Sequence, residues 1–103
     1  MPEYIVFVMP PEDEDAEPFD IPEWGYIEAL ATVDRYCAHG WKACIIDYGT
    51  PFVPWRAGRL DGPDIRVMAR TCDEAVIRAR AISYDCNSFQ REDYRCEISS
   101  TPH

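Results

Sequence analysis

Hydrophobic and polar positions alternate most regularly in residues 63–82, and this segment guides the prediction for the rest of the chain. Apolar residues occupy every second position from Ile65 to Ala69, which is typical of a half-buried strand. Thr71 and Glu74 then have the spacing of a capping box, which marks the start of a helix. Apolar residues recur every three or four positions along its predicted inward stripe, namely Cys72, Ala75, Val76, Ala79, Ile82 and Cys86. The segment therefore predicts a strand that leads directly into a helix.

Two further strands and a helix are predicted before this segment. Residues 4–9 are apolar on both faces, which indicates a strand in the middle of a sheet. Pro22 suits the first turn of a helix and Gly40 suits its left-handed C-terminal cap. The predicted inward stripe of this helix comprises Tyr26, Leu30, Val33 and Cys37, with Ile27 and Ala29 beside it. Residues 41–48 form the next predicted strand.

A long connection is predicted over residues 49–63, because three glycines and three prolines interrupt it. Its apolar residues favour a loop that folds back over an open sheet face. The alternative is that Trp55 and Arg56 are anchors for a partner, since these residue types are enriched at binding hot spots. After a polar connection at 85–93, alternation over residues 94–99 predicts the last strand.

The order strand, helix, strand, strand, helix, strand predicts an α+β fold of the ferredoxin-like βαββαβ type. Such a fold has one four-stranded antiparallel sheet with two helices on one face. It would make residues 1–103 a single domain with an acidic loop at 10–21. The open face of that sheet would place Arg66, Met68 and Arg70 beside an apolar patch of the first strand. A patch of this kind is expected to be covered by the 49–63 loop, by a second copy in a homodimer, or by a partner.

Charge is distributed unevenly along the chain. The formal net charge is −9, and residues 1–34 contain ten acidic residues and no Lys or Arg. The densest run places six acids in nine residues: Glu12, Asp13, Glu14, Asp15, Glu17 and Asp20. One interpretation is a solvated loop that aids solubility, and the other is a contact surface for a basic partner. In either case Phe19 and Ile21 are expected to anchor its far end to the core.

No motif in the sequence indicates catalysis, a metal site or a cofactor, which favours a non-enzymatic protein. Nucleic acid is disfavoured as a partner because the negative charge repels phosphate. No apolar run is long enough to span a bilayer and no signal peptide is recognisable, so a cytoplasmic location is predicted. The five cysteines include no C-x-x-C pair and are expected to be reduced core thiols, with a disulfide or metal role as the alternative.

The leading hypothesis is a small binding or inhibitory protein whose acidic residues engage a basic surface of another protein. The expected contact residues are the six acids at 12–20, with Trp55 and Arg56 as anchors. Clustered carboxylates can imitate the phosphates of nucleic acid and occupy a channel lined by Lys and Arg. In size and charge the chain resembles phage-encoded inhibitors of host defence, such as anti-CRISPR and anti-restriction proteins.

The alternative hypothesis is a dimeric ferredoxin-like domain that binds a small molecule, or acts on one, in an apolar pocket between sheet and helices. The residues expected to line that pocket are Phe7, Trp41, Tyr48 and Trp55. Loss of function after substitution of Trp55, with tolerance of charge reversal in the acidic run, would favour this alternative.

Overall fold

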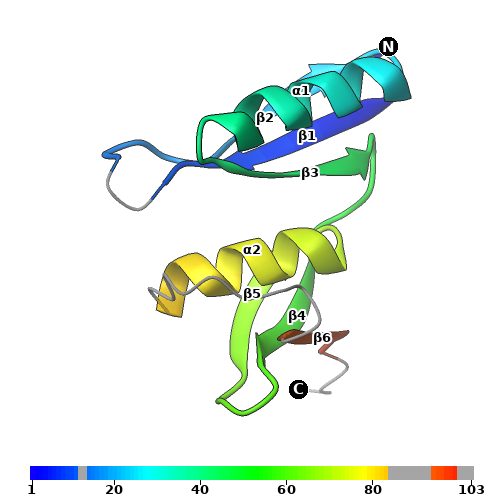
Figure 1. Cartoon of the computed structure of the whole chain (residues 1–103). Coiled ribbons are helices and arrows are strands. Elements are labelled where there is room, and N and C mark those ends of the chain that lie inside the picture. Colours follow the sequence, from blue (N-terminus) through cyan, green and yellow to red (C-terminus); the bar gives the residue numbers. More distant parts are fainter. Residues whose placement is uncertain (12–13, 84–93, 100–103) are drawn as a thin grey trace. The chain divides into compact units, whose positions relative to one another are not determined.

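The computed structural model describes residues 1–11, 14–83 and 94–99. These residues form two helices and two three-stranded antiparallel sheets, so the fold is of the α+β class (Figure 1). Contacts divide the chain into two compact units, Met1–Thr50 and Pro51–His103, which we call the first unit and the second unit. The sequence predicts one domain, whereas each unit has a sheet and a helix of its own.

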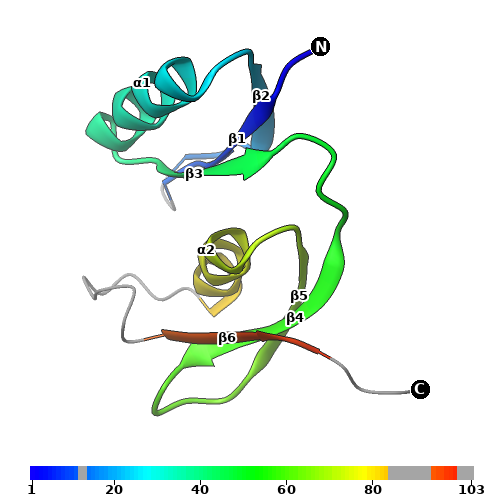
Figure 2. The ribbon, with the colours of Figure 1, turned by 90° about the vertical axis from the view of Figure 1, so that its right-hand side faces the viewer.

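The first unit has the order strand, strand, helix, strand: β1 (Tyr4–Met9), β2 (Phe19–Glu23), α1 (Tyr26–Ala38) and β3 (Lys42–Asp47). Strand β1 is central, and β2 and β3 flank it in antiparallel pairs. Helix α1 follows β2 and lies along one face of this sheet (Figure 2). Ala29 of α1 packs against Val6 and Val8 of β1, and all three side chains are fully buried.

The second unit repeats this order: β4 (Val53–Arg59), β5 (Ile65–Ala69), α2 (Cys72–Ser83) and β6 (Tyr94–Ile98). Strand β4 is central, between β5 and β6. Ala75 and Ala79 of α2 pack against Ala57, Val67 and Ala69 of the sheet. The two units therefore have the same topology, although the sequence shows no repeat at residue level.

The prediction of one four-stranded ferredoxin-like sheet is wrong, because two strands were missed. Strand β2 lies partly in the predicted acidic loop 10–21 and continues through Pro22, where a helix was expected. Strand β4 lies inside the predicted loop 49–63. Since β1 and β5 belong to different sheets, the predicted open face that joined them does not exist.

Proline and glycine residues are the reason that the sequence pattern does not predict β2 and β4. Pro22 lies on the edge strand β2, where a missing N–H is tolerated. Pro54 lies near the start of the central strand β4, and its carbonyl accepts a hydrogen bond from Ser99 just beyond β6 (2.9 Å). The missing N–H of Pro54 therefore lies at the end of the hydrogen-bond ladder between β4 and β6. Gly58 is required by close approach, because a Cβ there would overlap the carbonyl oxygen of Pro63.

The inward side of α1 also differs from the prediction. The helix begins at Tyr26 rather than at Pro22, and Tyr26, Leu30 and Cys37 are all exposed. The side chains that face the sheet, or are buried under α1, are Ala29, Thr32, Val33 and Tyr36. Thr32 is buried because its hydroxyl donates a hydrogen bond to the carboxylate of Glu23. The predicted cap at Gly40 is confirmed, with φ at 87°.

The strand–helix segment at residues 63–82 is confirmed as β5 and α2. Ala75, Val76 and Ala79 are buried as predicted, but Ile82 is exposed. Arg70, which was expected on the open sheet face, is buried directly after β5. Cys86 and the connection at 85–93 lie outside the described residues.

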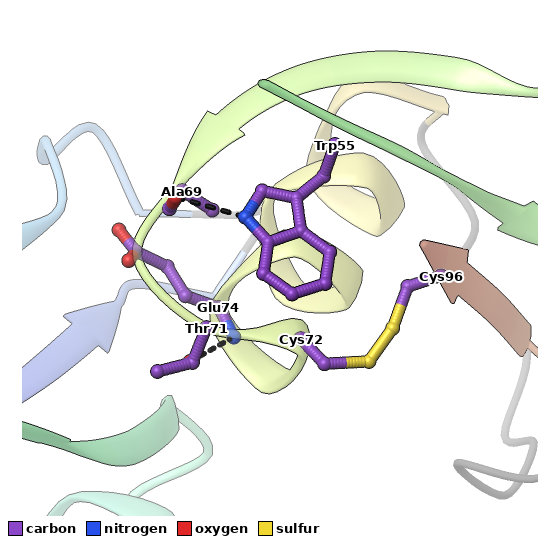
Figure 3. Close-up of a disulfide and its surroundings, with 6 residues drawn as sticks. All are labelled: Trp55, Ala69, Thr71, Cys72, Glu74 and Cys96. Carbon is purple, nitrogen blue, oxygen red and sulfur yellow. Dashed lines mark hydrogen bonds between the residues drawn. A yellow bond between two sulfur atoms is a disulfide. The ribbon is translucent and has the colours of Figure 1, made fainter. Parts of the chain in front are cut away.

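Cysteine pairing also departs from the prediction of reduced thiols. Cys72 at the start of α2 and Cys96 in β6 form a disulfide, with their Cα atoms 6.0 Å apart (Figure 3). Cys44 is a buried thiol outside this disulfide, as predicted, whereas the thiol of Cys37 is exposed. Disulfides are typical of oxidising compartments, so this bond does not favour the cytoplasmic location, which stays a prediction.

Candidate interaction surface

The acidic segment joins β1 to β2 in the first unit. Glu12 and Asp13 lie outside the described residues, and Glu14, Asp15 and Glu17 are exposed. The N–H of Glu14 donates a hydrogen bond to the carbonyl of Pro11 (3.1 Å), which turns the chain after β1. The three described carboxylates are therefore presented to solvent from a connection that starts with a turn.

Aromatic packing holds the far end of this segment. The ring of Phe19 contacts Tyr36 and Trp41 edge to face, with centroids 6.1 and 5.8 Å apart, and the Tyr36 and Trp41 rings are 5.2 Å apart. Ile21 packs on the buried cluster under α1. The expectation that Phe19 and Ile21 anchor the acidic segment is confirmed. Asp20, which lies between them, is exposed on β2.

The acids of the first unit have few cationic partners in the sequence. Residues 1–50 contain eleven acidic residues and only two basic ones, Arg35 and Lys42, for a net charge of −9. Glu14, Asp15 and Glu17 form no ion pair with any other described residue. The charge of the acidic segment is therefore not neutralised within the described part of the first unit.

Trp55 and Arg56, the two predicted anchors, lie on opposite faces of the sheet of the second unit. The indole N–H of Trp55 donates to the carbonyl of Ala69 (2.9 Å), and the ring packs on the core under α2 (Figure 3). Arg56 pairs with Glu97 across the sheet (2.8 Å). Both side chains are half-buried and have partners within their own unit.

A buried charge cluster occupies the start of α2. Glu74 is fully buried, and its carboxylate accepts hydrogen bonds from Arg70 (2.9 and 3.1 Å) and Arg78 (2.8 Å). Burial alone would raise the pKa of Glu74, but the hydrogen bonds from Arg70 and Arg78, together with the charge of Arg70, outweigh it and lower the pKa. The Phe52 ring lies 4.5 Å from the Arg70 guanidinium carbon. Every group here is used inside the unit, so the cluster is structural.

The four residues expected to line a small-molecule pocket are not gathered within either unit. Phe7 alternates with Val6 and Val8 along β1 and so lies on the sheet face opposite α1. Trp41 packs on the α1 side with Tyr36. Tyr48 is exposed after β3, and Trp55 belongs to the second unit.

Exposed apolar side chains at the start of α1 were not predicted. Trp24 and Ile27 are 66% and 75% exposed, and Tyr26 and Leu30 are also exposed. The sequence predicts Tyr26 and Leu30 on the inward side because large apolar residues usually form the core side of a helix. Small Ala29 and the paired polar Thr32 occupy that side instead. Glu23 and Thr32 form a hydrogen bond although they are nine positions apart in the chain, and no sequence pattern indicates this pairing.

No family model, curated protein or solved structure matches this chain. Among the described residues, no group of three or more His, Cys, Asp or Glu side chains is placed to hold a metal ion. Neither of the two described helices has the length and apolar character needed to cross a membrane.

Proposed function

We propose that the protein is a small non-enzymatic binding protein, of the inhibitory type, whose first unit engages a basic surface of a partner protein. The observation that supports this proposal is the placement of charge. The first unit carries the whole net charge of −9, and the second unit has eight acidic and eight basic residues. Complementary charge of this density accelerates association and disfavours wrong partners.

The acidic segment is the proposed centre of the contact. Glu14, Asp15 and Glu17 are exposed, and Phe19 fixes the end of the segment against Tyr36 and Trp41. Carboxylates on a segment that is anchored at one end lose less conformational entropy on binding than those on a free tail of the same charge. Such carboxylates can occupy a channel lined by Lys and Arg that otherwise holds nucleic acid. The proposed partner class is therefore nucleic-acid-binding proteins, including the nucleases that anti-CRISPR and anti-restriction inhibitors block.

The test compares capture of partners by the wild type and by a charge-reversed variant, Glu14→Lys/Asp15→Lys/Glu17→Lys. The immobilised proteins are exposed to lysate of the native host at about 0.05 M and about 0.5 M salt, where exposed charges are weakly and strongly screened. The wild type is expected to retain a basic nucleic-acid-binding protein at low salt and to release it at high salt or on addition of DNA. The variant is expected to retain none of it.

A matched control separates position from total charge. Glu3→Lys/Glu28→Lys/Asp47→Lys changes the net charge equally, at exposed positions of the first unit outside the acidic segment. This control is expected to keep most of the binding. Equal loss in both variants, or retention by the acidic-segment variant, would contradict the proposal. Circular dichroism checks that both variants are folded.

A further inference from the structure

The outer side of α1 is an exposed apolar surface that the acidic segment does not explain. Ile27 is 75% exposed, and Leu30 and Tyr26 are 40% and 53% exposed. Trp24, two residues before the helix, is 66% exposed. Isolated exposed apolar residues are ordinary, but four large ones within seven residues form a concentration that usually marks an interaction site.

The helix geometry brings two of these positions, Ile27 and Leu30, to one side. Ala29 and Thr32 are buried and define the side of α1 that faces the sheet. Ile27, Leu30 and Asp34 follow one another at helical spacing of three and four residues, so they lie next to each other away from the sheet. The ring of Tyr26 contacts Tyr4 of β1, with centroids 5.6 Å apart, so Tyr26 lies beside the sheet. We call Ile27, Leu30 and Asp34 the outer face of α1. It combines an apolar centre with a carboxylate that is exposed at its C-terminal end.

Charge decides what can cover this face. The first unit has a net charge of −9, and Asp34 and Glu28 on α1 are both exposed. A second copy packed through the same face would bring two such units together, and like charges repel across an interface. A surface with Lys or Arg around an apolar patch would bury Ile27 and Leu30 and pair with Asp34. Charge complementarity therefore favours a basic partner over self-association.

We infer that the outer face of α1 docks an apolar surface with a basic rim on the partner protein. The inference rests on the proposed function and adds a second, apolar contact to the acidic one. The acidic segment would supply salt-dependent attraction, and the α1 face would supply contacts that salt does not screen. The partner recognised in this way is a protein that carries an apolar patch next to its basic channel.

The inference is tested with two helical peptides of equal length and charge. One is an amphipathic Lys/Leu peptide, and the other has Ser in place of Leu. The labelled peptides are titrated with the full chain, and binding is measured by fluorescence anisotropy. The wild type is expected to bind the Lys/Leu peptide at least about tenfold more tightly, and to keep this preference at about 0.5 M salt, because burial of the leucines is favourable at either salt concentration.

Two variants locate the preference. Ile27→Ser/Leu30→Ser is expected to bind both peptides equally, while the control Met68→Ser/Ile98→Ser, at exposed apolar positions of the second unit, keeps the wild-type preference. Asp34→Lys is a second variant that leaves the apolar side chains in place, and it is expected to weaken binding of the Lys/Leu peptide about threefold. All four apolar positions are exposed, so their substitution changes stability little.

The outcomes distinguish this inference from the proposed function. Equal binding of both peptides by the wild type, or an unchanged preference in Ile27→Ser/Leu30→Ser, would overturn the α1 contact and leave the charge-based function standing. Absence of salt-dependent binding to either peptide would overturn the proposed function itself. A wild-type dimer in light scattering that Ile27→Ser/Leu30→Ser converts to a monomer would show that a second copy occupies the face, which also overturns the inference.

Discussion

The two units have the same topology but satisfy their charged groups in opposite ways. Each consists of a hairpin, a helix and a third strand, with the first strand in the centre of the sheet. In each, two residues separate the second strand from the helix: Trp24 and Gly25 in the first unit, Arg70 and Thr71 in the second. Each helix also has a glutamate as its third residue, Glu28 in α1 and Glu74 in α2. The differences therefore lie in side chains rather than in architecture.

The second unit pairs its charges internally. Its eight acidic and eight basic residues balance, and the described ion pairs include Arg56 with Glu97, Arg95 with Asp64, and Glu74 with two arginines. A disulfide adds a covalent link. The first unit has a large charge excess and exposed apolar residues on its helix. This contrast is consistent with the proposed function, in which the second unit satisfies its charges internally and the first unit meets a partner.

The largest expected effect separates the two equivalent glutamates. Glu74→Ala leaves the buried Arg70 without its carboxylate and is expected to destabilise the second unit by about 3–5 kcal/mol. Glu28→Ala removes an exposed carboxylate and is expected to change stability by less than about 0.5 kcal/mol. Hydrogen exchange followed by mass spectrometry measures the opening of each unit separately. Equal effects of the two substitutions would remove the distinction between the units.

Removal of the disulfide is the next largest expected effect. Cys72 and Cys96 are 24 positions apart, and closing a loop of that length contributes about 3.5 kcal/mol in the chain-entropy estimate. Cys72→Ala/Cys96→Ala, or treatment with a reductant, is therefore expected to lower the free energy of unfolding by about that amount. Cys37→Ala, at an exposed free thiol, is the control. Thiol titration that finds all five cysteines free in the folded protein would restore the prediction of reduced thiols.

The parts of the fold that sequence could predict are those with strong hydrophobic periodicity. Strands β1, β3, β5 and β6 and both helices were predicted because long apolar patterns mark them. Strands β2 and β4 were not, because Pro22 in one and Pro54 with Gly58 in the other are typical of loops. Only long-range pairing with β1 and with β5 and β6 makes these segments strands. Without β2 and β4 the remaining strands suggest one four-stranded sheet, and with them the chain forms two three-stranded sheets.

The candidate site was predictable in its charge but not in its apolar part. The acids and the anchors Phe19 and Ile21 can be identified from composition and spacing alone. The outer face of α1 depends on which side of the helix is buried, and tertiary contacts decided that. Thr32 lies inward because its hydroxyl donates a hydrogen bond to the carboxylate of Glu23 in β2, which no local pattern indicates. Trp55 lies inward because its indole N–H donates a hydrogen bond to the carbonyl of Ala69.

Lowering the pH tests how much the ionised carboxylate of Glu74 stabilises the second unit, without any substitution. The pKa of Glu74 in the folded protein lies below its ordinary value of 4.5. The ionised carboxylate therefore contributes its full stabilisation above pH 4.5 and loses it as the pH falls through the lower folded-state pKa. Urea unfolding of the wild type is expected to show this loss, and Glu74→Gln is expected to lack that component. Parallel pH profiles would show that Glu74 is not held ionised by Arg70 and Arg78.

The smallest expected effect concerns how the two helices begin. The hydroxyl of Thr71 accepts a hydrogen bond from the N–H of Glu74 (3.2 Å), whereas Gly25 provides no side-chain cap for α1. The reciprocal half of the predicted capping box differs, because the Glu74 carboxylate accepts from the N–H of Arg70 rather than from that of Thr71. Thr71→Ala is expected to cost about 1 kcal/mol, and Thr71→Gly less, because glycine is a tolerated N-cap.

The equivalent change in α1 tests whether the first unit is less fixed at its helix start. Gly25→Ser introduces a capping oxygen and is expected to stabilise the first unit by a few tenths of a kcal/mol, roughly the difference between these residues as N-caps. The side chain of Glu28 lies where the new Cβ would stand and must turn away, which is easy for an exposed carboxylate. Because Ile27 and Leu30 follow directly, a better-formed first turn would also order the outer face of α1. Gly25→Ser is expected to bind the Lys/Leu peptide more tightly and the Lys/Ser peptide with unchanged affinity. This result would show that the stability of the first turn of α1 contributes to binding at its outer face.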